Sequence, residues 1–376
     1  MADRLPLFLW YLGRRGAGPR YTMELARELA GRPDVELHVA LSRQSELFAE
    51  TCAIGAPVLA VDTYSGMGGF VASLPRVPSI ARTLRSYVAK HRLPAALCTM
   101  AHLWNCALVP ALKAGGAANC LVVHDAAPHA GENYGIRHMM IRRDICQADA
   151  IITLSEAVRR QVVENYCPAP DRLWSSSIAP FRYGAAADRR PRILGEPPYR
   201  LLFFGRLLPY KGLDQLIEAM QLLAGRNLPV TLLVAGSGGA DLPPLPPNVD
   251  LDRSWIPESQ IPSLFADVDL VVLPYQEASQ SGVIPIARHL GVPTVVTPVG
   301  GLLEQVAFGA AGFVAQGTSA AALAQAIGAA LADKQAYARM SAALLADNSD
   351  ELWARAADSI LAAARGALAN RRRPVS

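Results

Sequence analysis

The sequence predicts an α/β chain of two domains, each built on a parallel sheet with helices on both faces. Short apolar runs alternate with segments whose apolar residues recur at helical spacing, which is the pattern of repeated β-α units. This alternation pauses near residue 180 and restarts at Tyr199, so the chain divides into two halves. A length of 376 residues is enough for two domains of ordinary size.

In the first half, six apolar runs are expected to be buried strands and five amphipathic segments are expected to be helices. The strands are expected at Leu5–Leu12, Val35–Leu41, Pro57–Val61, Ala95–Met100, Cys120–His124 and Ala150–Leu154. The helices are expected at Tyr21–Ala30, Ile80–His91, Trp104–Ala114, Ile136–Gln147 and Glu156–Tyr166.

Between the halves, Phe181–Pro198 contains several prolines and three consecutive alanines, and it is expected to link the domains. The second half is expected to contain strands at 201–204, 230–235, 270–274 and 293–297 and helices at 213–223, 282–290, 320–332, 334–345 and 350–369. We therefore expect one domain at 1–185, completed by a C-terminal helix at about 350–376, and a second domain at 186–349.

Composition excludes several classes of protein. A hydrophobic content of 51% with 18% charged residues excludes wholesale disorder, and no apolar run approaches the roughly 18–20 residues that span a bilayer. The N-terminus is expected to be a first strand and not a signal peptide. Six cysteines without a Cys-x-x-Cys pair are expected to be free thiols in a reducing cytoplasm.

The two halves differ in charge. Residues 1–190 hold 22 Lys and Arg against 16 Asp and Glu, whereas residues 191–376 hold 14 against 16. The basic first half favours an anionic acceptor or peripheral contact with the anionic inner face of a membrane over nucleic acid, and chance composition is an equal alternative. The basic tail Asn370–Pro374 would either touch such a surface or remain solvated.

One loop carries two cations at the end of an expected strand. Arg206 and Lys211 follow the run that ends at Phe204, and Gly205 and Gly212 allow sharp turns on either side. Loops at the carboxyl edge of a parallel sheet bind ligands, and two fixed positive charges there suit a diphosphate. The alternative is that both are ordinary solvated cations.

A series of motifs in the second half resembles the nucleotide-sugar-binding half of the retaining glycosyltransferases of family 4, which have the GT-B architecture. The matching segments are 204–212, 236–238, 266–274, 291–297 and 300–304. The resemblance implies two Rossmann-like domains facing a central cleft. It also implies sugar transfer from a nucleotide diphosphate donor with retention, without a metal or other cofactor, in assembly of cell-envelope or exopolysaccharide glycans.

Candidate site residues in the first half follow from this resemblance. The loop Gly13–Pro19 lacks the dinucleotide spacing, but its Gly16 would lie against the donor diphosphate, unless the loop is only a tight turn. His124 would touch the donor sugar. Asp125 would bind the acceptor or orient His124.

Arginines of the first half are a further expectation. Arg14 and Arg15 would lie on the acceptor side, and with Arg20 and arginines of the helix 136–147 they would form a basic rim. A solvated helix face is the alternative for the latter.

In the second half, Gly205, Gly236 and Gly238 would let the nucleotide approach the backbone. Trp255 and Ile256 would pack the base or fill the core, and the residues do not separate these alternatives.

The family pattern of two glutamates is incomplete in this sequence. The first falls at Ala278, beside Glu277, which would take its place at the sugar, and the second falls at Ile286, which cannot accept a hydrogen bond from ribose. The amides of Ser281, Gly282 and Val283, at an expected helix start, would bind the diphosphate.

The function predicted is a cytoplasmic, metal-independent retaining glycosyltransferase in which His124, Arg206, Lys211 and Glu277 are catalytic. A nucleotide-sugar epimerase on the same fold and a non-catalytic nucleotide-sugar-binding relative remain as alternatives. The sequence leaves open the sugar, the base, the acceptor and the oligomeric state.

Overall fold

The structure, a computed structural model, describes residues 4–131, 134–184 and 189–372. It divides into two compact units. Unit 1 comprises Met1–Ala127, Gly135–Ile178 and Trp353–Ser376, and unit 2 comprises Pro128–Tyr134 and Ala179–Leu352. The boundary that corresponds to the expected 185/186 falls at 178/179, seven residues earlier.

Unit 1 is built on a seven-stranded parallel sheet with the order β3-β2-β1-β4-β5-β6-β7. Its strands are apolar and buried along most of their length, because helices cover both faces. They are β1 (Leu5–Tyr11), β2 (Val35–Ser42), β3 (Val58–Val61), β4 (Ala95–Cys98), β5 (Ala118–Val123), β6 (Ala150–Thr153) and β7 (Leu173–Ser175).

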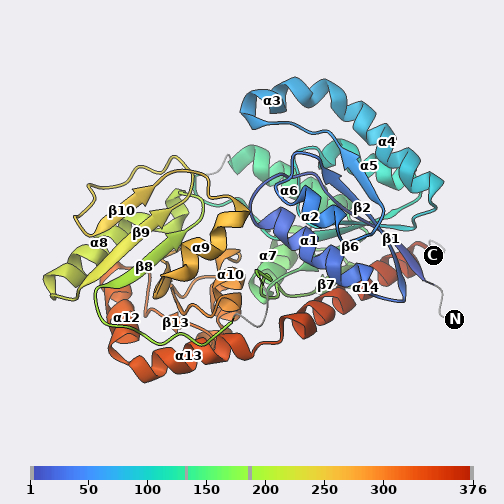
Figure 1. The fold of residues 1–376 in the computed structure, drawn as a ribbon. Coiled ribbons are helices and arrows are strands. Elements are labelled where there is room, and N and C mark those ends of the chain that lie inside the picture. The colour runs from blue at the N-terminus through green and yellow to red at the C-terminus, as the bar shows by residue number, and fades with distance from the viewer. Residues whose placement is uncertain (1–3, 132–133, 185–188, 373–376) are drawn as a thin grey trace. The chain divides into compact units, whose positions relative to one another are not determined.

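Helices of unit 1 pack on the two faces of this sheet (Figure 1). They are α1 (Ala17–Ala30), α2 (Phe48–Cys52), α3 (Gly66–Ser73), α4 (Val77–Lys90), α5 (Asn105–Ala114), α6 (Tyr134–Gln147), α7 (Glu156–Tyr166) and α14 (Ser349–Arg372). From α14, Trp353 packs 5.6 Å from the ring of Tyr21 in α1, and Gly366 lies against Trp174 of β7. The C-terminal helix therefore belongs to the core of unit 1 from Trp353 onward.

Asp144 is a buried carboxyl group of unit 1 that has a raised pKa. Asp144 of α6 accepts a hydrogen bond from Asn105 Nδ2 at 3.0 Å. Burial raises the pKa of Asp144 from 3.8 to about 6, which the Asn105 bond and the charge of Arg143 partly oppose.

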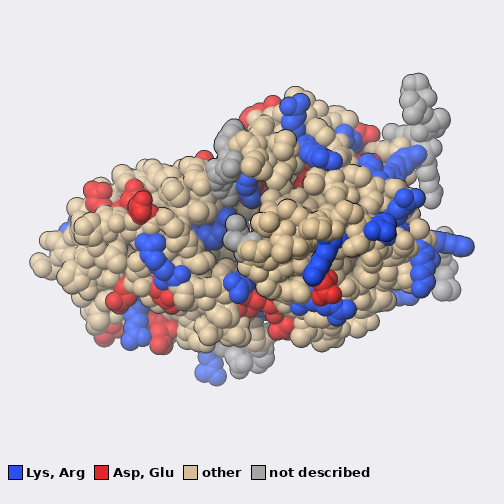
Figure 2. All heavy atoms as spheres, turned by 90° about the horizontal axis from the view of Figure 1, so that it is seen from above, with Lys and Arg blue, Asp and Glu red and all other residues tan. Residues whose placement is uncertain are grey.

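The basic character of the first half is visible on the surface of unit 1. No Asp or Glu occurs from Thr63 to His124, and Arg82, Arg85 and Lys90 are exposed on α4. Figure 2 shows Lys and Arg side chains spread over the part of the surface that includes this helix.

Unit 2 contains a six-stranded parallel sheet with the order β10-β9-β8-β11-β12-β13. Its strands are β8 (Tyr199–Phe204), β9 (Val230–Ala235), β10 (Val249–Asp252), β11 (Leu270–Leu273), β12 (Thr294–Val296) and β13 (Phe313–Val314). Its helices are α8 (Leu213–Gly225), α9 (Ile261–Ala266), α10 (Val283–His289), α11 (Leu302–Gln305), α12 (Ala320–Ala332) and α13 (Lys334–Ala346).

The segment expected to be the interdomain linker is built into unit 2 along its described residues. The guanidinium of Arg192 donates to the carbonyls of Phe265, Ala266 and Val268 at 2.9–3.0 Å and to that of Leu290 at 3.4 Å. Because one arginine satisfies carbonyls from two helix ends, it fixes this segment to the core of the unit.

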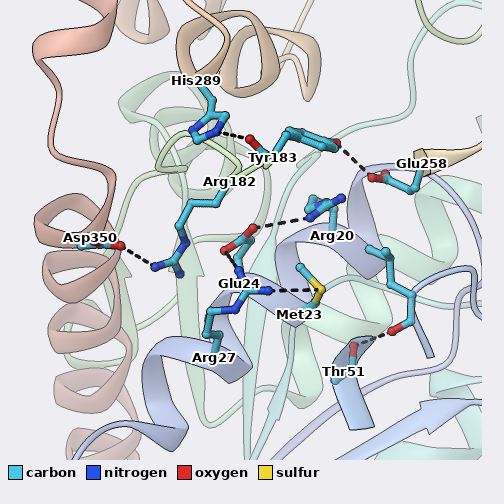
Figure 3. A network of polar contacts seen from close by, with 11 residues as sticks. Arg20, Met23, Glu24, Arg27, Thr51, Arg182, Tyr183, Glu258, His289 and Asp350 are labelled. Carbon is cyan, nitrogen blue, oxygen red and sulfur yellow. Dashed lines mark hydrogen bonds and ion pairs between the residues drawn. The ribbon is translucent and has the colours of Figure 1, made fainter. Parts of the chain in front are cut away.

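Other contacts of the same segment are shown in Figure 3. Tyr183 Oη donates to Glu258 Oε2 at 3.0 Å, and His289 Nε2 donates to the Tyr183 carbonyl at 2.9 Å. The expectation that 181–198 is a linker between the domains is therefore wrong for its described residues, because they belong to unit 2 and satisfy polar groups there.

The expected tail is also corrected in part. Asn370 and Arg371 continue α14, where Asn370 Nδ2 donates to the Asp171 carbonyl at 3.3 Å and Arg371 pairs with Asp149 at 3.2 Å. The expected tail residues 373–374 lie outside the described residues.

Candidate functional site

The topology of unit 2 brings two loops to one position. β8 pairs with β11 in the middle of the sheet, and the strand order reverses between them. The loop after β8 carries Arg206 and Lys211, and the loop after β11 carries Glu277. Ligands of open parallel sheets bind outside the carboxyl ends of the strands at such a reversal, so these loops form the candidate site of unit 2.

Lys211 is a buried cation held by aromatic rings. Its Nζ lies 3.5 Å from the centroid of the Tyr275 ring and 4.9 Å from that of Tyr210, and its residue is only 9% exposed. Cation–π contact stabilises the ammonium where water is largely excluded. The Tyr275 hydroxyl in turn lies 3.1 Å from Ser281 Oγ, so the ring that carries Lys211 is itself fixed.

Arg206 is exposed and lies within electrostatic reach of the same cluster. Burial raises the pKa of Tyr275, and the positive charge of Arg206 acts in the opposite direction. The space beside the α-carbon of Gly205 is nearly empty, because an added Cβ would meet only a Val283 methyl at 3.9 Å, and φ at this glycine is +134°. Lys211 therefore contacts the Tyr275 ring directly, whereas Arg206 acts on Tyr275 through its charge, and only Lys211 is buried.

Gly236 and Gly238 have a structural reason to be glycine. A Cβ at Gly236 would lie 1.9 Å from the Gly205 carbonyl oxygen, and one at Gly238 would lie 2.3 Å from that of Leu207. Leu207 N–H donates to the Ser237 carbonyl at 2.9 Å. Both glycines thus let the loop after β9 pack on the loop after β8, and their contact with a nucleotide stays a prediction.

Glu277 is exposed and already accepts a hydrogen bond from the protein. Its Oε1 accepts from the Ala130 amide at 2.6 Å and lies 3.8 Å from His129 Nδ1. Its side chain keeps 47% of its surface exposed, so a sugar hydroxyl can still reach the carboxylate.

Two of the three amides expected to bind diphosphate have protein acceptors. Ser281 N–H donates to Gln305 Oε1 at 2.7 Å, and Val283 N–H donates to Ser281 Oγ at 3.3 Å. The helix starts at Val283 and has seven residues, so Gly282 precedes it. A phosphate at these amides would have to displace Gln305, whose side chain also donates to the Ser281 carbonyl at 3.0 Å.

The remaining expected positions of unit 2 are partly or fully covered. Trp255 and Ile256 follow β10 and are half-buried, and both of their alternative roles stay open. Ile286 is 5% exposed on α10, in the position of the second family glutamate.

In unit 1, His124 directly follows β5. Its Nε2 donates to the Thr99 carbonyl at 2.8 Å, and its ring meets Tyr21 edge-on at 5.4 Å. Burial lowers the pKa of His124, against the opposing effects of the Thr99 bond and of Asp125. The ring is therefore neutral near pH 7 and carries its proton on Nε2.

The glycine loop of unit 1 accommodates a tyrosine. Added Cβ atoms at Gly13 and Gly18 would lie 2.0 and 2.6 Å from the Tyr11 side chain, and Gly16 has φ +82° at the start of α1. Gly13 and Gly18 therefore make room for the Tyr11 side chain, whereas Gly16 provides the turn.

The expected basic residues of unit 1 are engaged with neighbouring side chains. Arg14 lies 4.7 Å above the Tyr64 ring, Arg15 pairs with Glu46 at 3.3 Å, and Asp125 lies 3.9 Å from Arg137.

Arg20 does not fit an exposed basic rim. It is 8% exposed and lies 3.6 Å from Glu24, a buried carboxylate that Arg27 also contacts at 3.1 Å (Figure 3). Burial of Glu24 is possible because both neighbours carry positive charge.

Tyr210, Tyr275 and Gln305 are site residues that the sequence did not single out. Aromatic residues after buried strands are read as core, and Gln305 lies in a short helix without a motif, so no local signal identified them.

Two kinds of feature are absent from the described residues 4–131, 134–184 and 189–372. In those ranges no three or more His, Cys, Asp or Glu side chains gather as metal ligands would. None of the described helices combines the length and the apolar character needed to cross a membrane.

Two family models match the chain. The one described as "Glycosyl transferases group 1" matches residues 198–333, and the one described as "Glycosyl transferase 4-like domain" matches residues 16–173. Each lies within one half of the chain, and together they cover most of both.

Two curated relatives are similar to the chain. One is the D-inositol 3-phosphate glycosyltransferase of Nocardia farcinica, 29% identical over 60% of this chain and 54% of that protein. The other is the GDP-mannose-dependent alpha-(1-6)-phosphatidylinositol monomannoside mannosyltransferase of Mycolicibacterium smegmatis, 29% identical over 54% of this chain and 58% of that protein. The match thus spans little more than half the length of either relative.

Solved structures share the fold over the whole chain. The Anabaena protein HepE, solved in complex with UDP and glucose, superposes with a TM-score of 0.66 at 17% identity over 96% of this chain and 98% of its own. At this identity the likeness establishes the fold alone, and it confirms the predicted GT-B architecture of two parallel-sheet α/β domains.

Proposed function

Because the chain belongs to the glycosyl transferases group 1, which are glycosyltransferases of family 4 with the GT-B fold, we propose that it is a retaining enzyme that uses a nucleotide diphosphate sugar. The sugar would pass from the diphosphate to an acceptor hydroxyl, and a nucleoside diphosphate would leave.

The observation that carries this proposal is the setting of Lys211. Its ammonium is buried against Tyr275 beside the reversal point of the sheet, so its position is fixed before any ligand arrives. Departure of a diphosphate develops negative charge, and a preorganised cation at a low-dielectric site stabilises that charge more strongly than a solvated one does. Arg206, exposed at the same loop, would add a bidentate contact.

The sugar would be held by groups other than these cations. We assign Glu277 of unit 2 to the sugar hydroxyls, because its carboxylate is fixed and still accessible. His124 of unit 1, neutral and oriented by Thr99, is assigned to the donor sugar as in the family. Arg206 and Lys211 would take the part of a divalent metal ion, so turnover should persist in excess EDTA.

The relatives narrow the acceptor proposed. Their names specify inositol 3-phosphate and a phosphatidylinositol mannoside, and both of these acceptors carry phosphate. The acid-free stretch of unit 1 and its exposed arginines would suit an anionic acceptor of this kind. We therefore propose a phosphorylated polyol or its lipid-linked form, in glycan or cell-envelope assembly at the inner face of the membrane.

A turnover screen tests the proposal. Purified protein is incubated with UDP-glucose or GDP-mannose and with inositol 1-phosphate, inositol 3-phosphate or phosphatidylinositol vesicles, and released UDP or GDP is measured. Acceptor-dependent release, with the anomeric configuration of the product retained by NMR, is the expected result. Release that no acceptor accelerates would contradict transfer.

The same screen separates the two alternatives. An epimerase would produce an isomeric nucleotide sugar without acceptor. A non-catalytic relative, which Ile286 in place of the second glutamate keeps under consideration, would bind nucleotide sugar without turnover.

A further inference from the structure

A short segment of the β5–α6 connection folds with unit 2. The residues on either side of it, Ala127 and Gly135, belong to unit 1, whereas Pro128–Tyr134 belongs to unit 2. Its described part, 128–131, therefore belongs to unit 2, although the chain up to Ala127 and from Gly135 belongs to unit 1.

This segment touches both loops of the candidate site. On the loop after β8, the His129 ring stacks on Tyr210 with centroids 4.5 Å apart and 21° between planes. A Cβ on Gly131 would lie 2.8 Å from Pro209 Cδ, so glycine is needed for the close approach there.

On the loop after β11, the segment holds two side chains. His129 Nε2 lies 3.4 Å from Ser279 Oγ, and its Nδ1 lies 3.8 Å from Glu277 Oε1. The Ala130 amide donates to the same Glu277 oxygen at 2.6 Å. Because the His129 side chain is only 10% exposed, its ring is fixed by these neighbours and not by solvent.

The stack continues to the buried cation. Tyr210, covered on one side by His129, also lies 4.9 Å from Lys211 Nζ, which rests on Tyr275 at 3.5 Å. One histidine ring therefore contacts the carboxylate proposed for the sugar and the tyrosine that contacts the cation proposed for the diphosphate.

We propose that His129 is a positioning residue that sets the place of Glu277 relative to Lys211, and so determines how the sugar of the donor is held. The inference rests on the proposed function. The ring nitrogens act on Glu277 and Ser279, whereas the ring face acts on Tyr210, so the two effects can be separated by substitution.

The test uses His129→Phe, which keeps a ring for Tyr210 and removes the nitrogens, and His129→Ala, which removes both. Affinities of the full-length protein are measured for UDP-glucose and GDP-mannose and for UDP and GDP. His129→Phe should weaken binding of the nucleotide sugar about 10-fold while leaving that of the nucleoside diphosphate unchanged. His129→Ala should weaken both.

A double-mutant cycle with Glu277→Ala identifies the route of the effect. If His129 acts through Glu277, His129→Phe should change kcat/KM and sugar affinity little once Glu277 is already alanine. The matched control is His91→Phe, because His91 also packs against a tyrosine, with its ring centroid 4.4 Å from that of Tyr87 at a tilt of 38°, but lies at the end of α4 in unit 1. It should leave all affinities unchanged.

The outcomes are distinguishable. Additive effects of His129→Phe and Glu277→Ala, or equal losses for UDP and UDP-glucose, would overturn the positioning role while leaving the proposed function intact. Wild-type protein that binds none of the four nucleotides would overturn both. If His129→Ala does not fold, as judged by thermal unfolding, His129→Phe alone carries the test.

Discussion

Replacing Lys211 with methionine should separate the contribution of Lys211 to the stability of unit 2 from its contribution to turnover. Methionine keeps most of the aliphatic stem and removes the ammonium, which faces two tyrosine rings at 3.5 and 4.9 Å. A desolvated cation–π contact is worth up to about 2 kcal/mol, so unit 2 should lose about 1–2 kcal/mol of stability. For a unit of this size the unfolding midpoint should fall by about 2–8 °C.

The effect on turnover should be much larger than the effect on folding. Removal of one preorganised donor to a developing charge typically costs a factor of about 10²–10³ in turnover. The assay is release of nucleoside diphosphate under saturating donor, alongside a thermal melt. Lys334→Met is the matched control, because Lys334 is an exposed lysine of the same unit that pairs with Glu196 at 2.7 Å. Turnover of Lys211→Met within about fivefold of wild type would refute the role of the ammonium.

Three further predictions concern folding. Gly300→Ala should lower the stability of unit 2 by about 1–3 kcal/mol or more, because φ at Gly300 is +47° and the added Cβ would lie 1.7 Å from the Ala278 carbonyl oxygen. Gly225→Ala is the control, since a Cβ there meets open space and should not lower the stability of the unit. The two variants are compared by urea unfolding. Burial raises the pKa of Asp144 from 3.8 to about 6, so the folded state retains a proton that the unfolded chain releases, and this contribution to stability is lost as pH rises from about 4 to 6. The free energy of unfolding of Asp144→Asn, relative to that of the wild type, should therefore rise by up to about 3 kcal/mol from pH 4 to pH 7.5. A difference between the two proteins that does not change with pH would contradict the raised pKa of Asp144. Arg192→Ala should destabilise unit 2 by about 3–5 kcal/mol in the same assay, because four carbonyl contacts are lost, and a change below about 1 kcal/mol would show that water replaces them.

The strands and loops that carry the candidate site could be predicted because their signal is local. Val230–Ala235 and Ala320–Ala332 have the predicted bounds. Residues 201–204 of β8 and 270–273 of β11 are continuous apolar runs, which end at Gly205 and Pro274. Periodicity and breakers of this kind are read directly from the chain.

Contacts between distant loops could not be predicted in this way. Gly236 was interpreted as room for a nucleotide, but its neighbour is the carbonyl of Gly205, 31 positions away, and only the sheet order brings them together. Gln305 reaches the Ser281 amide across 24 positions for the same reason. Arg192 was predicted to lie in a linker, because the residues around it in the sequence do not indicate which distant carbonyls its guanidinium binds.

The isoleucine at position 286 indicates how the proposed site would discriminate between nucleotides. Ile286 is 5% exposed within α10, among the buried Val283, Ile284 and Ala287, so this helix face has no acceptor for a ribose hydroxyl. A site built to bond a hydroxyl rejects an analogue without it by orders of magnitude, whereas an apolar site does not. Bound mainly through its diphosphate at Lys211, 3′-deoxy-UDP or 2′-deoxy-UDP should therefore bind within about fivefold of UDP, measured by calorimetry. If either analogue binds a hundredfold more weakly than UDP, another side chain accepts the hydrogen bond of that ribose hydroxyl. The ribose would then lie away from α10.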